Sequence, residues 1–154
     1  MKNNFIKKLT PVLEESFIEM VKITQAKDVE GVLRKVWNEN GEDKAQLNYI
    51  EKFYVLFLNR ANMVVGYSLI SIGGISSTVA DGKVIFSNAL MSGCSAIILA
   101  HNHPSNKLIP SEQDISLTKR FVKFGKLIDL LVYDHIIIGC NSGEYYSLAE
   151  NGDI

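Results

Sequence analysis

A short, continuously apolar segment, Ala96–Ala100, leads directly into the polar sequence His101-Asn102-His103-Pro104. An apolar run without alternation is typical of a strand buried on both faces of a sheet, so other elements must cover both of its faces. The two histidines come where that strand is expected to end, and ligand sites in sheets that mix strands and helices lie at such strand ends. The segment therefore predicts a layered fold with a site at the end of a central strand.

The rest of the chain alternates the patterns of strands and helices. Asn59–Asn62 is a polar segment between two strand-like runs and indicates a hairpin, and Asp81 is placed to cap a helix that Gly93 follows. We therefore expect a mixed β-sheet that contains a hairpin and is flanked by helices, an α/β (α+β-like) architecture. The predicted strands cover residues 16–24, 53–58, 63–72, 96–100, 128–138 and 145–148, and the predicted helices cover residues 27–38, 81–91 and 111–126.

Length and composition are those of a chain that folds around one core. Of the 154 residues, 47% are hydrophobic, so a globular fold is expected and disorder is not. A polar break at Asn40–Lys44 is the best candidate for a boundary. We expect an N-terminal strand and helix element over residues 1–44, packed as one compact unit with a main domain over residues 45–154. Trp37, on the first predicted helix, is expected in the core.

Charge, hydropathy and cysteine content disfavour several classes of protein. The net charge of −1 and the pI of about 6.3 give no electrostatic basis for tight binding to nucleic acid. The apolar runs are far too short to span a membrane, and residues 1–8 lack the apolar stretch of a signal peptide. Cys94 and Cys140 do not make a disulfide framework and are expected to be reduced core residues. We therefore expect a cytoplasmic protein. The sequence gives no indication of its oligomeric state.

Two of the three histidines and one aspartate form a candidate metal site. His101 and His103 are two residues apart, so in an extended backbone their side chains point to the same side, and Pro104 favours that backbone. Asp114 falls in the first turn of the predicted helix 111–126, which would hold its carboxylate rigidly. Three protein ligands leave zinc one position for water, which is typical of a hydrolytic rather than a structural site.

These residues also have plainer interpretations. The two histidines can be ordinary loop residues, and the pair Ser111 and Asp114 can be a capping box at a helix start. His135, in an apolar strand, can be a further ligand, but a packed and hydrogen-bonded histidine is favoured. Phe121 and Phe124 lie among basic residues and are expected to face inward, which favours a solvated amphipathic helix over a nucleic-acid-binding face.

The spacing around these residues resembles the JAMM metalloprotease motif of JAB/MPN domains. In that motif a glutamate lies upstream of His-x-His, and an aspartate follows after ten intervening residues, as from His103 to Asp114. Within this superfamily the chain is most similar to the RadC-like proteins, over roughly residues 51–152. The similarity rests on Phe57-Leu58-Asn59, His101-Asn102-His103-Pro104-Ser105, Pro110-Ser111-x-x-Asp114, Thr118, Asp134-His135-Ile136-Ile137 and Tyr145-Tyr146-Ser147.

The resemblance implies a JAB/MPN (cytidine-deaminase-like) fold and a zinc-dependent hydrolase of the metallopeptidase or isopeptidase type, with one zinc ion per chain. Glu51 stands in the Glu-x-Phe-x-Val-Leu pattern of these proteins, and it would take a proton from the attacking water and pass it to the leaving amine. Without the resemblance, Glu51 is simply a polar residue at a strand start. Ser111 would donate a hydrogen bond to the developing oxyanion. The substrate would be a peptide or protein, and residues 70–78 are expected to border the cleft along a strand edge.

The chain also departs from the family pattern. It resembles short forms without the N-terminal helix-hairpin-helix segment of longer RadC proteins, so a DNA role inferred from that segment is not carried over. Asn106 stands where the family has glycine, and Gly82-Lys83-Val84 replaces Pro-Arg-Glu, but neither change removes a ligand. Two alternatives to a hydrolase stay open: a non-catalytic metal-binding or protein-interaction module, and a DNA-repair accessory protein of the RadC type.

Overall fold

The computed structural model describes residues 14, 16, 18–39, 49–73, 80–139 and 143–154. Its elements follow the predicted order, and apart from the N-terminal strand their bounds differ from the predicted ones by no more than three residues. The helices are α1 (Ala26–Glu39), α3 (Gly82–Ser92) and α4 (Glu112–Leu127), and the strands are β1 (Lys52–Leu58), β2 (Val64–Ile72), β3 (Ala96–His103), β4 (Leu131–Gly139) and β5 (Tyr145–Ser147).

The described strands form one mixed sheet in the order β2-β1-β3-β4-β5, with β3 at its centre. The predicted hairpin is confirmed, since β1 pairs antiparallel with β2, and β1 also pairs antiparallel with β3. The pairing of β3 with β4 is parallel, and that of β4 with β5 is antiparallel. A parallel pair requires a crossover, and α4 provides it. This crossover returns the chain along the sheet, so the start of α4 lies near the end of β3.

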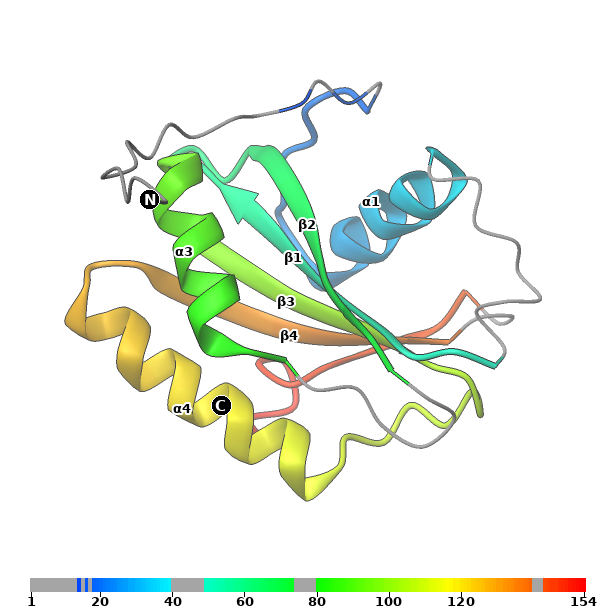
Figure 1. Cartoon of the computed structure of the whole chain (residues 1–154). Coiled ribbons are helices and arrows are strands. Elements are labelled where there is room, and N and C mark those ends of the chain that lie inside the picture. The colour runs from blue at the N-terminus through cyan, green and yellow to red at the C-terminus, as the bar shows by residue number, and fades with distance from the viewer. Residues whose placement is uncertain (1–13, 15, 17, 40–48, 74–79, 140–142) are drawn as a thin grey trace, which may run out of the picture.

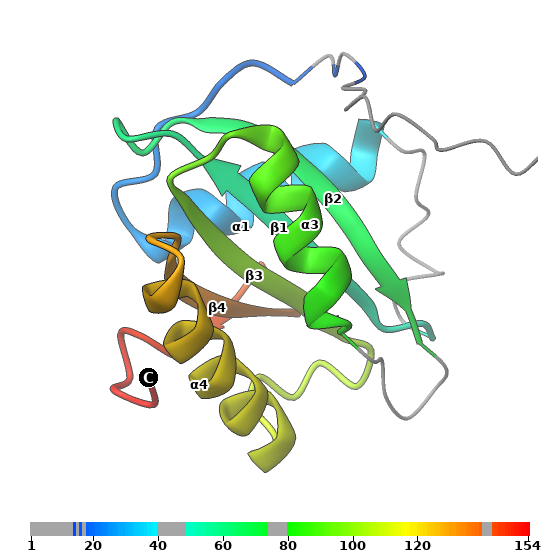
Figure 2. The same ribbon diagram turned by 60° about the vertical axis from the view of Figure 1, so that its left-hand side comes forward.

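Helices cover both faces of the sheet, which is why its central strands are continuously apolar (Figure 1). On one face α1 packs against the even-numbered residues of β1, and on the other face α3 and α4 pack against its odd-numbered residues. The turned view shows the same layers, with α1 behind the sheet and α3 in front of it (Figure 2). The predicted α/β architecture is therefore confirmed, and Trp37 of α1 lies in the core with 3% of its surface exposed.

Local sequence signals determine where α3 begins and ends. The Asp81 side chain accepts a hydrogen bond from the Lys83 backbone N–H, so Asp81 is the predicted N-cap. Gly93 follows the helix with φ of 67°, a left-handed conformation that glycine adopts without steric cost. The turn after Gly93 leads the chain directly into β3, the strand that carries the two histidines.

The prediction of a strand over residues 16–24 is wrong. Within its described part, the only backbone pairing of sheet type is an isolated bridge between Lys22 and Met63. The cause is the start of α1, where the Asp28 carboxylate accepts a hydrogen bond from the Thr24 backbone N–H and turns the chain into the helix. Residues 15 and 17, like the predicted boundary at residues 40–44, lie outside the described residues.

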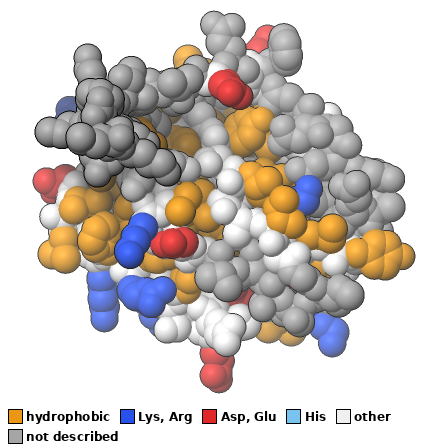
Figure 3. Space-filling model, viewed as in Figure 1, with side chains coloured by type: hydrophobic (Ala, Val, Ile, Leu, Met, Phe, Trp, Pro, Cys, Tyr) orange, Lys and Arg blue, Asp and Glu red, His pale blue; other side chains and the backbone are white. Residues whose placement is uncertain are grey.

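The prediction that both phenylalanines of α4 face inward is half right. Phe121 is buried, but 44% of Phe124 is exposed, although its ring centroid lies 4.6 Å from that of the buried Phe86 in α3. Hydrophobic side chains are indeed visible on this face of the molecule (Figure 3). Cys94 is a half-buried free thiol, whereas Cys140 lies outside the described residues. Among the described residues, no helix is both long enough and apolar enough to cross a lipid bilayer.

Gly125 allows the last turn of α4 to approach the start of β4. Its carbonyl accepts hydrogen bonds from the Ile128 and Leu130 backbone N–H groups, and a Cβ at Gly125 would lie 2.2 Å from the Leu130 carbonyl oxygen. Because backbone cannot move aside cheaply, we expect Gly125→Ala to lower the free energy of unfolding by about 1–3 kcal/mol or more, measured by urea denaturation.

The matched control is Gly31→Ala in α1, where the added Cβ would meet nothing within 4 Å. There the substitution removes only the helix penalty of glycine, so it should stabilise the protein by about 0.5–1 kcal/mol. Equal effects of the two substitutions would show that the close approach at Gly125 does not constrain the fold.

Candidate metal centre

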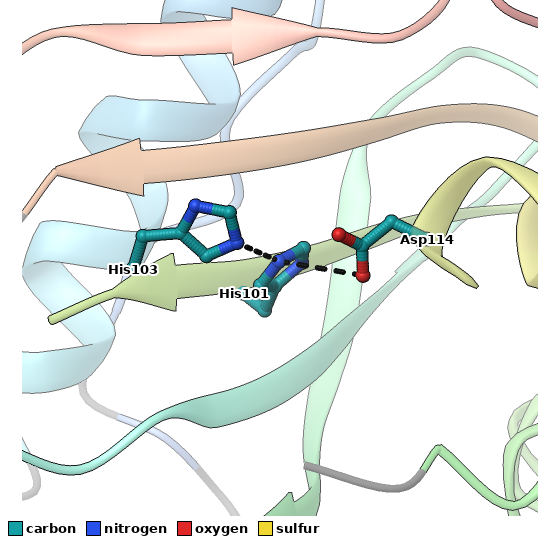
Figure 4. Close-up of side chains that lie close together, drawn as sticks. All are labelled: His101, His103 and Asp114. Carbon is teal, nitrogen blue, oxygen red and sulfur yellow. Dashed lines mark hydrogen bonds and ion pairs between the residues drawn. The ribbon is translucent and has the colours of Figure 1, made fainter. Parts of the chain in front are cut away.

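The strand β3 continues through His103, which is three residues beyond the predicted end, and so carries both histidines of the candidate site. Strand alternation places His101 and His103 on the same face of the sheet, as predicted, and the start of α4 brings Asp114 beside them (Figure 4). His101 is 1% exposed, whereas His103 and Asp114 are half-buried. The three predicted metal ligands therefore come together at one end of the central strand.

The distances between the ligand atoms fit a small divalent cation. The Nε2 atoms of His101 and His103 are 2.9 Å apart, and His101 Nε2 lies 3.7 Å from Asp114 Oδ1. One ligand atom from each of the three residues lies within 4.8 Å of the other two. Ligand atoms of a tetrahedral zinc ion are separated by about 3.3 Å, given zinc–ligand bonds of about 2.0–2.1 Å. Small adjustments of these side chains would therefore be enough to bind zinc.

The N-terminus of α4 orients the Asp114 carboxylate. Its Oδ2 accepts hydrogen bonds from the backbone N–H and the hydroxyl of Ser111, at 2.7 and 2.6 Å, and the Ser111 Oγ accepts one from the Asp114 backbone N–H. This is the predicted capping box. With Oδ2 held by the cap, Oδ1 faces His101, so capping and metal binding use different oxygens of one carboxylate.

A chain of hydrogen bonds determines which nitrogen of His101 carries the proton. The Thr118 hydroxyl donates its one hydrogen to the Asp114 carbonyl, so toward His135 Nδ1, 2.7 Å away, its oxygen can only accept. Nδ1 of His135 is therefore protonated, and its Nε2 accepts from His101 Nδ1 at 2.7 Å. This leaves His101 Nε2 with a lone pair, directed at His103 and Asp114, which is the tautomer a metal requires.

His103 is oriented in the same sense by a different partner. Its Nδ1 lies 2.5 Å from the Lys107 carbonyl oxygen, which can only accept, so Nδ1 is the donor. In neutral His103 the lone pair is then on Nε2, opposite the lone pair of His101 at 2.9 Å. Two lone pairs and a carboxylate oxygen at such distances repel unless a proton or a metal ion lies among them. The three residues could therefore hold a metal ion.

Burial keeps the two inner histidines neutral. Desolvation lowers the pKa of His135 to about 3, and it also lowers the pKa of His101 well below its usual range. The ring of Phe53 excludes water here, since it stacks on His101 at 5.9 Å and meets His135 edge-on at 5.3 Å. Neutral imidazoles are the form that binds metal, so this apolar surrounding favours ligation over protonation.

The two residues expected to perform catalysis are less directly placed. Glu51 lies immediately before β1, is half-buried, and its carbonyl accepts a hydrogen bond from the Gly73 backbone N–H at 2.8 Å. Ser111 is exposed beside Asp114, and its hydroxyl hydrogen is engaged by the capping box. Of the predicted cleft border at residues 70–78, residues 74–78 lie outside the described residues.

Sequence reasoning assigned no role to Thr118 and treated His135 as a packed histidine. His135 is indeed buried and hydrogen-bonded, and it is not one of the three grouped ligands. It belongs to the site nevertheless, because β4 lies beside β3 and places Leu99 opposite His135. A lone histidine in an apolar strand was the available signal, but its partner could be found only by knowing the strand order.

Comparison with known proteins agrees with this geometry. The family model described as the RadC-like JAB domain matches residues 23–153. This chain belongs to the RadC-like JAB domain family. Among its relatives, the UPF0758 protein of Flavobacterium johnsoniae is 35% identical over 90% of this chain and 56% of its own length, and that of Methanosarcina mazei is 34% identical over 90% and 57%. The UPF0758 protein of Porphyromonas gingivalis is 45% identical over 66% and 44%. The chain thus spans about half the length of these curated relatives.

Replacing His135 should weaken metal binding without removing a ligand. In His135→Phe, His101 Nδ1 loses its acceptor, so the tautomer with a free Nε2 is no longer favoured. We expect zinc affinity, measured by competition with a chromophoric chelator, to fall by about 10- to 100-fold. Ile137→Val, on the same buried strand, should leave the affinity unchanged. Equal affinities of His135→Phe and the wild type would contradict the proposed proton arrangement.

Acid should destabilise the metal-free protein. An unfolded histidine binds a proton below about pH 6.5, whereas folded His135 does so only near its pKa of about 3. The unfolded state therefore binds more protons within this window, and the free energy of unfolding should fall as the pH falls, by up to about 1.4 kcal/mol per pH unit from His135. Urea denaturation in chelator between pH 7 and pH 4 measures the slope. A slope unchanged in His135→Phe would contradict the assignment.

Proposed function

We propose that this chain is a zinc-dependent hydrolase of the metallopeptidase or isopeptidase type, with one zinc ion bound by His101, His103 and Asp114. The observation that carries the proposal is the convergence of two imidazole lone pairs and one carboxylate oxygen, each turned inward by a hydrogen bond on its far side. Three such ligands suit a hydrolytic zinc ion, because a fourth position is left for water. Membership of a JAB domain family supports the same reaction class.

The chemistry that zinc supplies in such a site is Lewis acidity, which polarises a carbonyl group and lowers the pKa of water to about 7. The chain itself must then provide a base for the proton of the attacking water. Glu51 is the proposed base, and it would deliver that proton to the leaving amine. The bond cleaved would be a peptide or isopeptide bond. The water oxygen would be joined to the carbonyl carbon, and the amine would leave with the proton.

The pairing of β1 with β3 supports this role of Glu51. Phe53 is paired with His101 at the end of the β1–β3 ladder, and Glu51 stands two residues before Phe53. Residues two apart share a face of a strand, and Phe53 stacks on His101 on the face that carries the ligands. Glu51 is therefore expected at the same end of the sheet as the candidate metal centre and on the same face.

Ser111 is proposed to stabilise the oxyanion by donating a hydrogen bond from its hydroxyl. In the capping box that hydrogen goes to Asp114 Oδ2. The Ser111 backbone N–H also donates to this oxygen, so the carboxylate stays oriented when the hydroxyl turns toward a substrate. Removing one such donor typically lowers kcat by about 100- to 1000-fold.

The proposed substrate is a peptide or protein in the cytoplasm, bound in an extended form. The strand β2 lies at one end of the strand order and leads at Gly73 toward the segment that holds Glu51. An extended chain that paired with this strand would run toward the metal centre. A partner bound there without cleavage would make the domain an interaction module instead.

Metal content is the first test. We expect purified wild-type protein to contain about one zinc ion per chain by elemental analysis, and His103→Ala and Asp114→Ala to contain less than about a tenth of that. Glu112→Ala is the matched control, because Glu112 is an exposed carboxylate in the same helical turn. Wild-type protein without metal, even after reconstitution with excess zinc, would overturn the proposal.

Activity is the second test, and it separates a hydrolase from a binding module. Zinc-loaded wild-type protein should release amines from a library of peptides and isopeptide-linked conjugates, while Glu51→Gln should retain zinc and lose turnover by about 100-fold or more. A wild-type protein that binds zinc and these ligands but cleaves none of them would be a metal-binding interaction module.

A further inference from the structure

The residue between the two histidine ligands has a distinct environment. Asn102 is completely buried in β3, and strand alternation directs it away from the face that carries His101 and His103. Burying an amide side chain is unfavourable unless its donor and its acceptor are both hydrogen-bonded. The partners of this amide therefore indicate why an asparagine is accommodated in an otherwise apolar strand.

Two backbone groups on either side of Glu51 are hydrogen-bonded to the Asn102 amide. Its Oδ1 accepts from the Lys52 backbone N–H at 2.8 Å, and its Nδ2 donates to the Ile50 carbonyl at 2.9 Å. A side-chain amide carries the same donor and acceptor as a peptide group. The pairing of β1 with β3 reaches Phe53 and His101, and beyond that pair the Asn102 side chain takes the place of the β3 backbone.

We propose that Asn102 is a positioning residue that holds Glu51 at a constant distance from the metal ligands, an inference that rests on the proposed function. The clamp consists of the two Asn102 hydrogen bonds and the bond from the Gly73 N–H to the Glu51 carbonyl. Because Asn102 is joined by peptide bonds to both histidine ligands, any movement of the end of β3 carries the Glu51 backbone with it.

The geometry also explains why other residues would not serve. Aspartate has the same shape, but it has no donor for the Ile50 carbonyl and would place a charge in a fully buried position. Alanine or leucine would leave both backbone partners without their hydrogen bonds. None of these changes touches a ligand atom, so their effect should fall on the position of Glu51 and not on the zinc ligands.

The test compares three variants of the full chain, each loaded with Zn²⁺ or Co²⁺. Asn102→Ala removes the two Asn102 hydrogen bonds of the clamp, and Glu51→Gln removes the proposed base. Asn59→Ala is the matched control, because Asn59 lies at the other end of β1 and its side chain also makes two hydrogen bonds to backbone groups, accepting at Oδ1 from the Ala61 and Met63 N–H groups. The measurements are zinc affinity, hydrogen exchange at the Gly73 N–H, and the pH at which the visible absorption of the Co²⁺ form changes.

We expect Asn102→Ala to bind zinc within about threefold of the wild type, since every ligand and its orienting partner is retained. Exchange at the Gly73 N–H should accelerate by about five- to tenfold, because its acceptor is the Glu51 carbonyl, which lies between the two backbone groups that Asn102 holds. The pH response of the Co²⁺ spectrum should shift in the same direction as in Glu51→Gln, while Asn59→Ala should match the wild type in all three measurements.

Two results would overturn the inference. In the first, Asn102→Ala binds metal and its Co²⁺ spectrum changes at the same pH as in the wild type, whereas in Glu51→Gln that pH is shifted. The other is a zinc affinity that falls by more than about 100-fold in Asn102→Ala, which would place Asn102 in support of the ligands instead. Should Asn102→Ala fail to fold, Asn102→Ser is measured in its place. Failure of the proposed function gives a different pattern, in which wild-type protein binds no metal or Glu51→Gln leaves the Co²⁺ response unchanged.

Discussion

The hydrogen-bond chain from the Asp114 carbonyl through Thr118 and His135 to His101 is the interaction on which the candidate site depends. It joins α4, β4 and β3, and each link has only one possible direction, because a carbonyl cannot donate and a hydroxyl has one hydrogen. The direction of the chain leaves a lone pair on His101 Nε2. The same helical turn also presents Oδ1 of Asp114, whose carboxylate is oriented separately by the capping box with Ser111.

The layered fold makes this chain of bonds possible by keeping water out. His101 and His135 are almost completely buried on the face of the sheet that α3 and α4 cover, where Thr118 of α4 contacts His135 and the ring of Phe53 packs on both histidines. In such surroundings a neutral imidazole is favoured over a charged one, so protons do not compete strongly for the ligand nitrogens. On the opposite face of β3, the Asn102 amide makes hydrogen bonds that join this strand to the segment that carries Glu51.

Most of the fold and the grouping of the three candidate ligands could be predicted from the sequence. The apolar run of β3, the polar hairpin connection and the caps of α3 and α4 are local signals, and the structure confirms them. The predicted strand over residues 16–24 was wrong, because the turn into α1 leaves only the bridge at Lys22. The inward direction predicted for Phe124 was also wrong, because periodicity along one helix does not show how much of each side chain the neighbouring elements cover.

Alternation along β3 and the capping pattern at Ser111 by themselves determined that His101, His103 and Asp114 could converge, since both depend on residues close in the chain. Only the tertiary structure decided which nitrogens carry protons and what holds Glu51. Those answers depend on contacts between distant segments: His135 is 34 residues from His101, and Asn102 is 50 residues from Lys52. Such pairs are set by strand order and register, which follow from the packing of the whole sheet and not from any local pattern.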